Sequence, residues 1–152
     1  MKKEIKKQVY FAGAIRGDRI EAENIISFIH YIQELGHKVL TEHIADKKIS
    51  DKKMKAEDIE KRDIAWLDCA NHVIAEISGA STGTGREIEY ARVKHYFGNK
   101  KARILCLYES KREFSASPMI RGMTPERYEN VIIRKYKSIK EAKEIIKKFL
   151  ES

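Results

Sequence analysis

The segment that decides the fold is Ser78-Gly79-Ala80-Ser81-Thr82-Gly83-Thr84-Gly85-Arg86-Glu87, which directly follows the apolar run Val73-Ile74-Ala75-Glu76-Ile77. A β-branched run that ends in small hydroxyl and glycine residues and then becomes helical predicts a strand, a tight turn and a helix N-terminus. Gly83 and Gly85 permit positive φ angles and close approach of the backbone, and the first N–H groups of a helix have no partner within it. The segment therefore predicts a turn that a phosphate would satisfy.

Glu87 separates this segment from an ordinary glycine-rich turn. We expect it in the first turn of the helix, where the helix dipole favours an ionised carboxylate. Two anions in one site repel each other unless each has its own partner, so a carboxylate beside a phosphate site needs a chemical reason. The alternative is a serine- and glycine-rich turn with a solvated glutamate, and these residues alone leave both interpretations open.

The rest of the chain alternates between strand-like and helical spacing of its apolar residues. Further strands are expected at 7–13, 38–41, 102–108 and 130–133, and helices at 25–35, 51–70, 87–97 and 139–150. Gly36 and Gly98 are expected to end the first and third helices, and Ser50 or Asp51 to cap the second. Strands that alternate with helices predict an α/β fold, a doubly wound domain of the Rossmann or flavodoxin type with a five-stranded parallel sheet. Its ligand should bind beyond the carboxyl ends of the strands.

Length and composition limit the class of protein further. A chain of 152 residues without a linker rich in Pro, Gly or Ser predicts a single domain, 1–152. The charged N-terminal segment lacks the apolar core of a signal peptide, no run approaches membrane-spanning length, and Cys69 and Cys106 show neither disulfide nor metal spacing, so we expect a cytoplasmic protein. The formal charge of +8 favours anionic ligands. Because most basic residues are mixed with acids at helical spacing, nucleic acid is not a favoured partner.

Asp63 does not fit the pattern of the helix expected at 51–70. The apolar stripe of that helix contains Ile59, Trp66, Leu67 and Ala70, and Asp63 lies four residues after the first and three before the second. Asp63 is therefore expected on the buried face, where a carboxylate is costly unless paired and burial favours the protonated form. A structural aspartate bonded to a neighbouring turn explains this position, and so does a proton donor or a partner for a substrate hydroxyl.

Six separated motifs carry a resemblance to one family. They are Tyr10–Gly17, Leu40–His43, Asp63–Leu67, Ala75–Ile77, Ser81-x-Gly83-x-Gly85-x-Glu87 and Ser117-x-Met119-Ile120-Arg121-Gly122. Together, over residues 8–134, they resemble the 2'-deoxynucleoside 5'-monophosphate N-hydrolases of the nucleoside 2-deoxyribosyltransferase superfamily. The resemblance implies a homodimer, without a metal or redox cofactor, that cleaves the bond between the base and C1' of a nucleotide. The products would be the free base and the sugar 5-phosphate.

The resemblance also implies roles for individual residues. Glu87 matches the nucleophile, Tyr10 the tyrosine that positions it, and Asp63 a carboxyl that acts on the base side. The positions that match substrate-binding residues, chiefly for the 5'-phosphate, are Gly13, Ile15, Arg16, Ser81, Gly83 and Gly85. Ser117 and Met119 match a loop that the neighbouring subunit lends to the site.

The chemistry of these residue types agrees with such a reaction. Cleavage of an N-glycosidic bond develops oxocarbenium character at C1', which a carboxylate such as Glu87 can stabilise or capture, as in retaining glycosidases. A carboxyl with a raised pKa can protonate the departing base, a role that suits a buried Asp63.

Two residues depart from the family pattern. Ala14 stands where relatives often carry a phosphate-binding serine, and Asn71 stands where they often carry aspartate. A weaker phosphate site would favour a nucleoside 2-deoxyribosyltransferase that exchanges bases between nucleosides. The net charge alone would favour a non-catalytic domain that binds nucleotides or nucleic acid.

Overall fold

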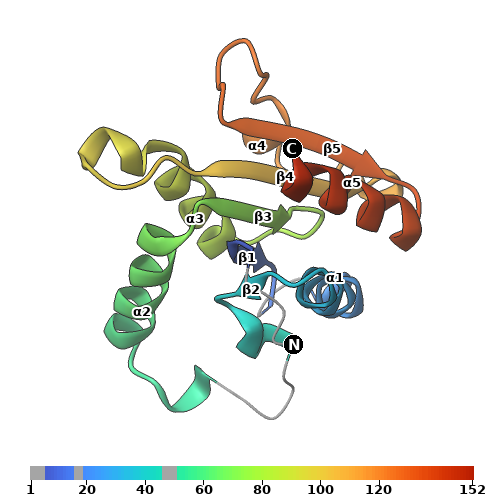
Figure 1. Cartoon of the computed structure of the whole chain (residues 1–152). Helices are drawn as coiled ribbons and strands as arrows, with labels where there is room; N and C mark the ends of the chain where they lie inside the picture. The colour runs from blue at the N-terminus through green and yellow to red at the C-terminus, as the bar shows by residue number, and fades with distance from the viewer. Residues whose placement is uncertain (1–5, 16–18, 46–50) are drawn as a thin grey trace.

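The strands of the chain form one parallel sheet. The computed structural model describes residues 6–15, 19–45 and 51–152. The sheet has the strand order β2-β1-β3-β4-β5, and each neighbouring pair is parallel (Figure 1). The strands are β1 (Gln8–Gly13), β2 (Lys38–Val39), β3 (His72–Glu76), β4 (Arg103–Glu109) and β5 (Val131–Tyr136). The predicted α/β class with a five-stranded parallel sheet is confirmed.

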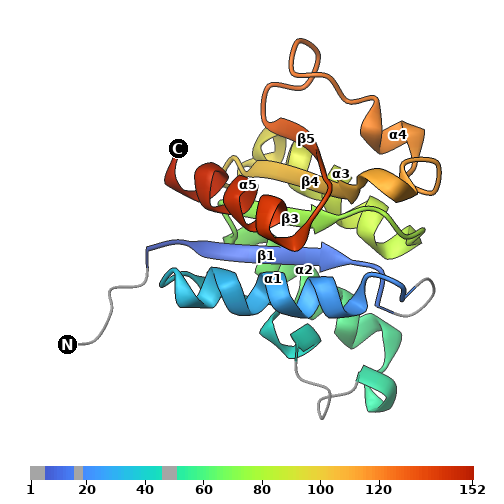
Figure 2. The ribbon, with the colours of Figure 1, turned by 90° about the vertical axis from the view of Figure 1, so that its right-hand side faces the viewer.

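Helices cover both faces of the sheet. The helices are α1 (Ala22–Glu34), α2 (Ala56–Cys69), α3 (Thr82–Val93), α4 (Pro118–Arg121) and α5 (Ile139–Glu151). Four short 3₁₀ helices join them, η1 (Glu42–Ala45), η2 (Asp51–Lys53), η3 (Lys94–Phe97) and η4 (Ser110–Arg112). Figure 2 shows α1 and α5 in front of the sheet, with α2 and α3 behind it.

Two hydrophobic cores result from this layering. Phe11 of β1 packs with Phe28 of α1 on one face, whereas Tyr10 packs on the other face in the core that contains Leu67 of α2 and Ile88 of α3. Successive residues of a strand point to opposite faces, so β1 contributes to both cores. The side chain of Tyr10 therefore enters the face on which α2 and α3 lie.

The predicted helix ends agree with the structure at two glycines. Gly36 follows α1 with φ 94°, and Gly98 follows η3, the continuation of α3, with φ 93°. Such positive φ angles strain any residue with a Cβ atom, which explains glycine at both positions.

The start of α2 differs from the prediction. The helix begins at Ala56, with Lys55 as the cap residue, rather than at residue 51. Asp51 lies in η2, and Ser50 lies outside the described residues. The Asp51 carboxylate does not cap α2 but accepts hydrogen bonds from Arg62, which lies within α2.

The start of α3 also differs, and this changes the expected position of Glu87. Ser81 caps the helix by accepting a hydrogen bond from the Thr84 N–H at 3.2 Å, so α3 begins at Thr82. Gly83 and Gly85 therefore lie within the helix, and neither adopts the positive φ that a glycine permits. Glu87 lies in the second turn rather than the first, where the helix dipole has little effect on its charge.

The sheet reverses its winding between β1 and β3. From β1 the chain enters α1 on one face, and from β3 it enters α3 on the other, while the two strands lie side by side. Ligands of doubly wound sheets bind at such a switch point, beyond the carboxyl ends of the strands. Within residues 6–15, 19–45 and 51–152, no helix is both long enough and apolar enough to cross a bilayer.

Candidate active site

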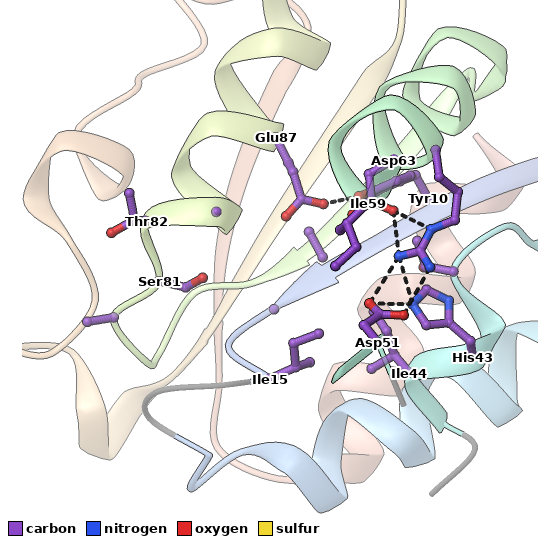
Figure 3. Close-up of a pocket in the computed structure, with 16 residues that line it drawn as sticks. Tyr10, Ile15, His43, Ile44, Asp51, Ile59, Asp63, Ser81, Thr82 and Glu87 are labelled. Atoms are coloured by element: carbon purple, nitrogen blue, oxygen red, sulfur yellow. Dashed lines mark hydrogen bonds and ion pairs between the residues drawn. The ribbon is translucent and has the colours of Figure 1, made fainter. Parts of the chain in front are cut away.

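A cavity of about 470 Å³ lies at the carboxyl ends of β1 and β3 (Figure 3). The start of α3 lines one end with Ser81, Thr82 and Gly83. The opposite end is lined by side chains of η1, η2 and α2, among them His43, Asp51, Ile59, Arg62 and Asp63. Figure 3 shows Tyr10 and Glu87 between these two ends. The cavity is therefore polar at both ends and has one carboxyl group, Glu87, near its middle.

Glu87 and Tyr10 form a hydrogen-bonded pair in this cavity. The Tyr10 hydroxyl donates to Oε2 of Glu87. Burial raises the pKa of Glu87 to about 7, while the Tyr10 hydrogen bond acts in the opposite direction and favours the carboxylate. Burial and the adjacent charge of Glu87 raise the pKa of Tyr10, so Tyr10 stays protonated and remains the donor. Glu87 is thus poised between its two protonation states near neutral pH.

Asp63 faces the cavity and is paired with its neighbour in the chain. Arg62 Nε donates to Asp63 Oδ1 at 2.9 Å, and the Asp63 side chain is 27% exposed. Asp63 was expected on the core-facing side of its helix; it is instead half-buried, because this side of α2 faces the cavity. The ion pair gives the Asp63 carboxylate a partner, which offsets part of the cost of its partial burial.

Arg62 organises the end of the cavity around α2. Its Nη1 and Nη2 atoms donate to Oδ1 and Oδ2 of Asp51 at 3.0 and 3.1 Å, and its Cζ lies 4.8 Å from the centroid of the Trp66 ring. The His43 ring packs against Trp66 with a centroid distance of 5.4 Å. Burial and the charge of Arg62 lower the pKa of His43, which is therefore neutral at neutral pH.

Sequence reasoning gave no site role to Arg62, Asp51 or His43. His43 belongs to one of the motifs that carry the family resemblance, and Arg62 adjoins Asp63, so these positions were the available signals. The fork from Arg62 to Asp51 joins residues 11 positions apart through a bend between η2 and α2, which apolar periodicity does not reveal.

Most of the other predicted site residues lie together. Gly13, Ile15, Ser81 and Gly83 line the same cavity as Tyr10, Asp63 and Glu87. Gly85 is not among the lining residues, and its N–H donates to the Ser81 carbonyl within α3 at 3.1 Å. Arg16 lies outside the described residues.

Ser117 and Met119 do not line the cavity of their own chain. The Ser117 hydroxyl accepts a hydrogen bond from the Met119 N–H at 3.2 Å at the start of α4, and Met119 is 84% exposed. The segment 109–124 that carries them is attached to the turn after β3, because Ser115 Oγ donates to the Ser78 carbonyl at 2.6 Å. The sequence-predicted site is thus divided between a cavity and an exposed loop at the same edge of the sheet.

The buried carboxyl group of Glu76, at the end of β3, holds that turn in place. Its Oε1 accepts from the Ser78 N–H at 2.5 Å, and its Oε2 accepts from the Tyr136 hydroxyl. Glu76 is 1% exposed, and burial raises its pKa to about 7. These contacts fix the path of the chain from β3 toward Ser81, which explains a buried glutamate at the end of an otherwise apolar strand.

The chain has relatives over most of its length. It is 33% identical over 141 residues to a protein of Nematostella vectensis assigned as 2'-deoxynucleoside 5'-phosphate N-hydrolase 1, with 90% of each chain covered. A protein of Thermofilum pendens with the same assignment is 34% identical over 136 residues, with 89% of each chain covered. The 5-hydroxymethyl-dUMP N-hydrolase of Mus musculus is 36% identical over 118 residues, which are 75% of this chain and 64% of the relative. No family model matches the chain.

A solved structure has the same fold. The CMP N-glycosidase of Clostridium botulinum aligns with a TM-score of 0.65 at 23% identity, covering 94% of this chain and 99% of the other. The relatives from Nematostella vectensis and Thermofilum pendens are identical to this chain at about a third of the aligned positions, over about 90% of each protein. Both are assigned as 2'-deoxynucleoside 5'-phosphate N-hydrolases. The chain therefore belongs to the 2'-deoxynucleoside 5'-phosphate N-hydrolases, a family of enzymes.

Proposed function

We propose that the protein hydrolyses the N-glycosidic bond of 2'-deoxynucleoside 5'-monophosphates and releases the free base and deoxyribose 5-phosphate. The observation that supports this most strongly is the position of Glu87 near the middle of the cavity, between the start of α3 and the polar side chains of α2. The names of the sequence relatives point to the same reaction.

The start of α3 is the proposed site of the 5'-phosphate. The side chains of Ser81 and Thr82 and the backbone at Gly83 line this end of the cavity. The first N–H groups of a helix lack partners within it and carry partial positive charge, so they bind phosphate oxygens well. Arg16, which matches a phosphate-binding position of the family, would add a full positive charge.

Glu87 is the proposed nucleophile. Tyr10 holds its Oε2, while its Oε1 lies on the side of Gly83 and the proposed phosphate site. As the base departs with the electrons of the C1'–N bond, Oε1 stabilises the sugar cation or bonds to C1'. Water then attacks C1', the Glu87 carboxylate is released, and deoxyribose 5-phosphate carries the hydroxyl, while the proton that the water loses goes to the departed base. Asp63 contacts the base at the opposite end.

We further propose that the active unit is a homodimer in which each subunit lends Ser117 and Met119 to its neighbour's cavity. Three features support this arrangement: both residues lie outside the lining of their own cavity, Met119 is 84% exposed, and their segment lies at the edge of the sheet where substrate would enter. The resemblance assigns the same two positions to a shared loop.

The Glu87→Gln variant tests the chemistry. An amide neither captures nor stabilises the sugar cation, so kcat for base release should fall on the order of 10³-fold or more, while nucleotide affinity changes little. Released base is measured by chromatography and affinity by titration calorimetry. Glu89→Gln is the control, because it removes the same charge from an exposed position of the same helix.

Two outcomes would contradict the proposal. Turnover of Glu87→Gln near the parent rate would remove Glu87 from the nucleophile position. A parent protein that exchanges bases between nucleosides, but releases none from the monophosphates, would be a transferase instead.

A further inference from the structure

Arg62 is a half-buried cation at the base end of the cavity, and the proposed reaction leaves it without a role. Its guanidinium contacts two carboxylates at once, Asp51 through a two-pronged fork at 3.0 and 3.1 Å and Asp63 through Nε at 2.9 Å. The Arg62 side chain is 22% exposed and that of Asp51 12%. A bidentate fork in such a sheltered place fixes the guanidinium in orientation as well as in position.

The surroundings of Arg62 hold it further. Its Cζ lies 4.8 Å over the Trp66 ring, a cation–π contact, and its Nη2 lies 3.4 Å from Nε2 of His43. Because burial and Arg62 lower the pKa of His43, the histidine adds no charge of its own at neutral pH. The cluster at this end therefore consists of one cation between two carboxylates.

Asp63 is the member of this cluster that is nearest to the chemistry. It lines the cavity, and its charge acts on both Tyr10 and Glu87. Only Oδ1 is engaged by Arg62, and no residue in the described parts of the chain donates a hydrogen bond to Oδ2. A carboxylate accepts hydrogen bonds and donates none. The orientation in which Arg62 holds Asp63 thus decides which group of the base meets its Oδ2.

We propose that Arg62 is a positioning residue that determines base specificity, because it holds the Asp63 carboxylate by Oδ1 and leaves Oδ2 to accept a hydrogen bond from the base. This inference rests on the proposed function and adds the class of base that the enzyme prefers. A base that offers an amino group to Asp63, such as cytosine, should be a better substrate than one that offers a carbonyl oxygen there, such as uracil. A carboxylate accepts from the 4-amino group of cytosine and repels the 4-carbonyl oxygen of uracil. Without Arg62, nothing holds the Asp63 carboxylate in this orientation, so the difference between the two bases should shrink.

The experiment compares dCMP with dUMP, which have nearly the same shape but differ at this group. The parent should show a higher kcat/KM for dCMP, and Arg62→Gln should lower the dCMP/dUMP ratio of kcat/KM by about tenfold or more. Arg62→Lys, which keeps the cation, should retain part of the preference. Lys61→Gln removes the same charge from the exposed neighbour and should leave the ratio unchanged.

A binding measurement separates this role from a merely structural one. Deoxyribose 5-phosphate has no base, so its dissociation constant should stay within about twofold in Arg62→Gln if Arg62 acts only at the base end. An unchanged dCMP/dUMP ratio, a parent that prefers dUMP, or an equal loss of affinity for the baseless sugar phosphate would each overturn the inference. A parent that releases base from neither nucleotide would instead overturn the proposed function, and the inference with it.

Discussion

At the scale of single residues, the hydrogen bond from Tyr10 determines the pH range in which Glu87 is ionised. Burial raises the pKa of Glu87 to about 7, and the Tyr10 hydroxyl opposes part of that rise. The proposed reaction needs the carboxylate form of Glu87. We therefore expect kcat/KM to rise as the pH increases through about 7, and to fall below pH 7 as Glu87 becomes protonated.

Tyr10→Phe should move this pH profile upward. Removing the donor to Glu87 Oε2 takes away an interaction that favours the carboxylate, so the pKa of Glu87 rises and the acid limb shifts to higher pH by about one unit. The measurement is kcat/KM from pH 5 to 9, with Tyr31→Phe on α1 as the control. An acid limb that stays at the same pH, or moves downward, would show that Tyr10 does not tune Glu87.

The sequence could predict residues whose chemistry is local. Tyr10 lies in β1, and Glu87 lies in α3, the helix that follows β3. Because all strands of a parallel sheet run the same way, the α/β pattern alone brings both residues toward one edge. The sequence placed Asp63 in a helix but did not predict its ion pair with Arg62. A pattern of apolar residues gives no information on which neighbour an arginine side chain contacts. Arg62 and Asp51 meet only after η2 and α2 take their positions.

At the scale of elements, the start of α3 shows that the spacing of glycine and serine residues predicts the presence of a turn better than it predicts where the turn ends and the helix begins. The prediction read the glycines as loop residues, but the Ser81 hydroxyl provides a cap that lets the helix begin at Thr82. The proposed phosphate site therefore depends on two features of α3, the N–H groups at its start and the lack of a side chain at Gly83.

Gly83→Ala and Gly85→Ala form a matched pair that tests this. A Cβ at Gly85 would meet no atom within 4 Å, and one at Gly83 would lie 3.8 Å from Glu87 Oε1 and 4.0 Å from Ser81 Oγ, so neither substitution clashes. Each alanine should stabilise the helix by up to about 1 kcal/mol. Only the Gly83 methyl group enters the cavity, so KM for the monophosphate should rise about tenfold in Gly83→Ala and stay unchanged in Gly85→Ala.

Two measurements decide the comparison, urea unfolding for stability and steady-state kinetics for KM. Equal effects of both alanines on KM would mean that the backbone freedom of the glycines, rather than the space at Gly83, matters for binding. A large loss of stability in either variant would contradict the helical position of these residues.

At the scale of the whole molecule, the sequence predicted the class of the sheet and the edge of the sheet at which the cavity lies. Alternating strands and helices required parallel strands with helices on both faces, and the observed order β2-β1-β3-β4-β5 places the switch point between β1 and β3. The order itself was not predicted, since it depends on which face each connecting helix covers. The assembly of subunits is even harder to predict from the sequence. A loop that covers the cavity of its own chain and a loop that covers the cavity of a neighbouring subunit have the same local sequence pattern.

The exposed segment with Ser117 and Met119 allows these two arrangements to be told apart by mixing inactive subunits. Glu87→Gln lacks the proposed nucleophile, and a variant with Ser117→Ala and Met119→Ala lacks the proposed shared contacts. If the loop crosses between subunits, a mixed dimer contains one cavity with both Glu87 and an intact loop. After exchange of equal amounts, half of the dimers are mixed and one of their two sites is complete, so about a quarter of the parent activity should return.

A loop that covers its own cavity predicts a different result, because each subunit then carries its own defect into any dimer. Activity would stay at the background of the two variants even after the mixed dimer is isolated by differential tagging. A parent that sediments as a fully active monomer would exclude sharing as well. Either result would leave the proposed role of Glu87 unchanged, because Glu87 and Tyr10 form their hydrogen bond within one chain. Recovery of activity in the mixed dimer, by contrast, requires that residues from two chains complete one site.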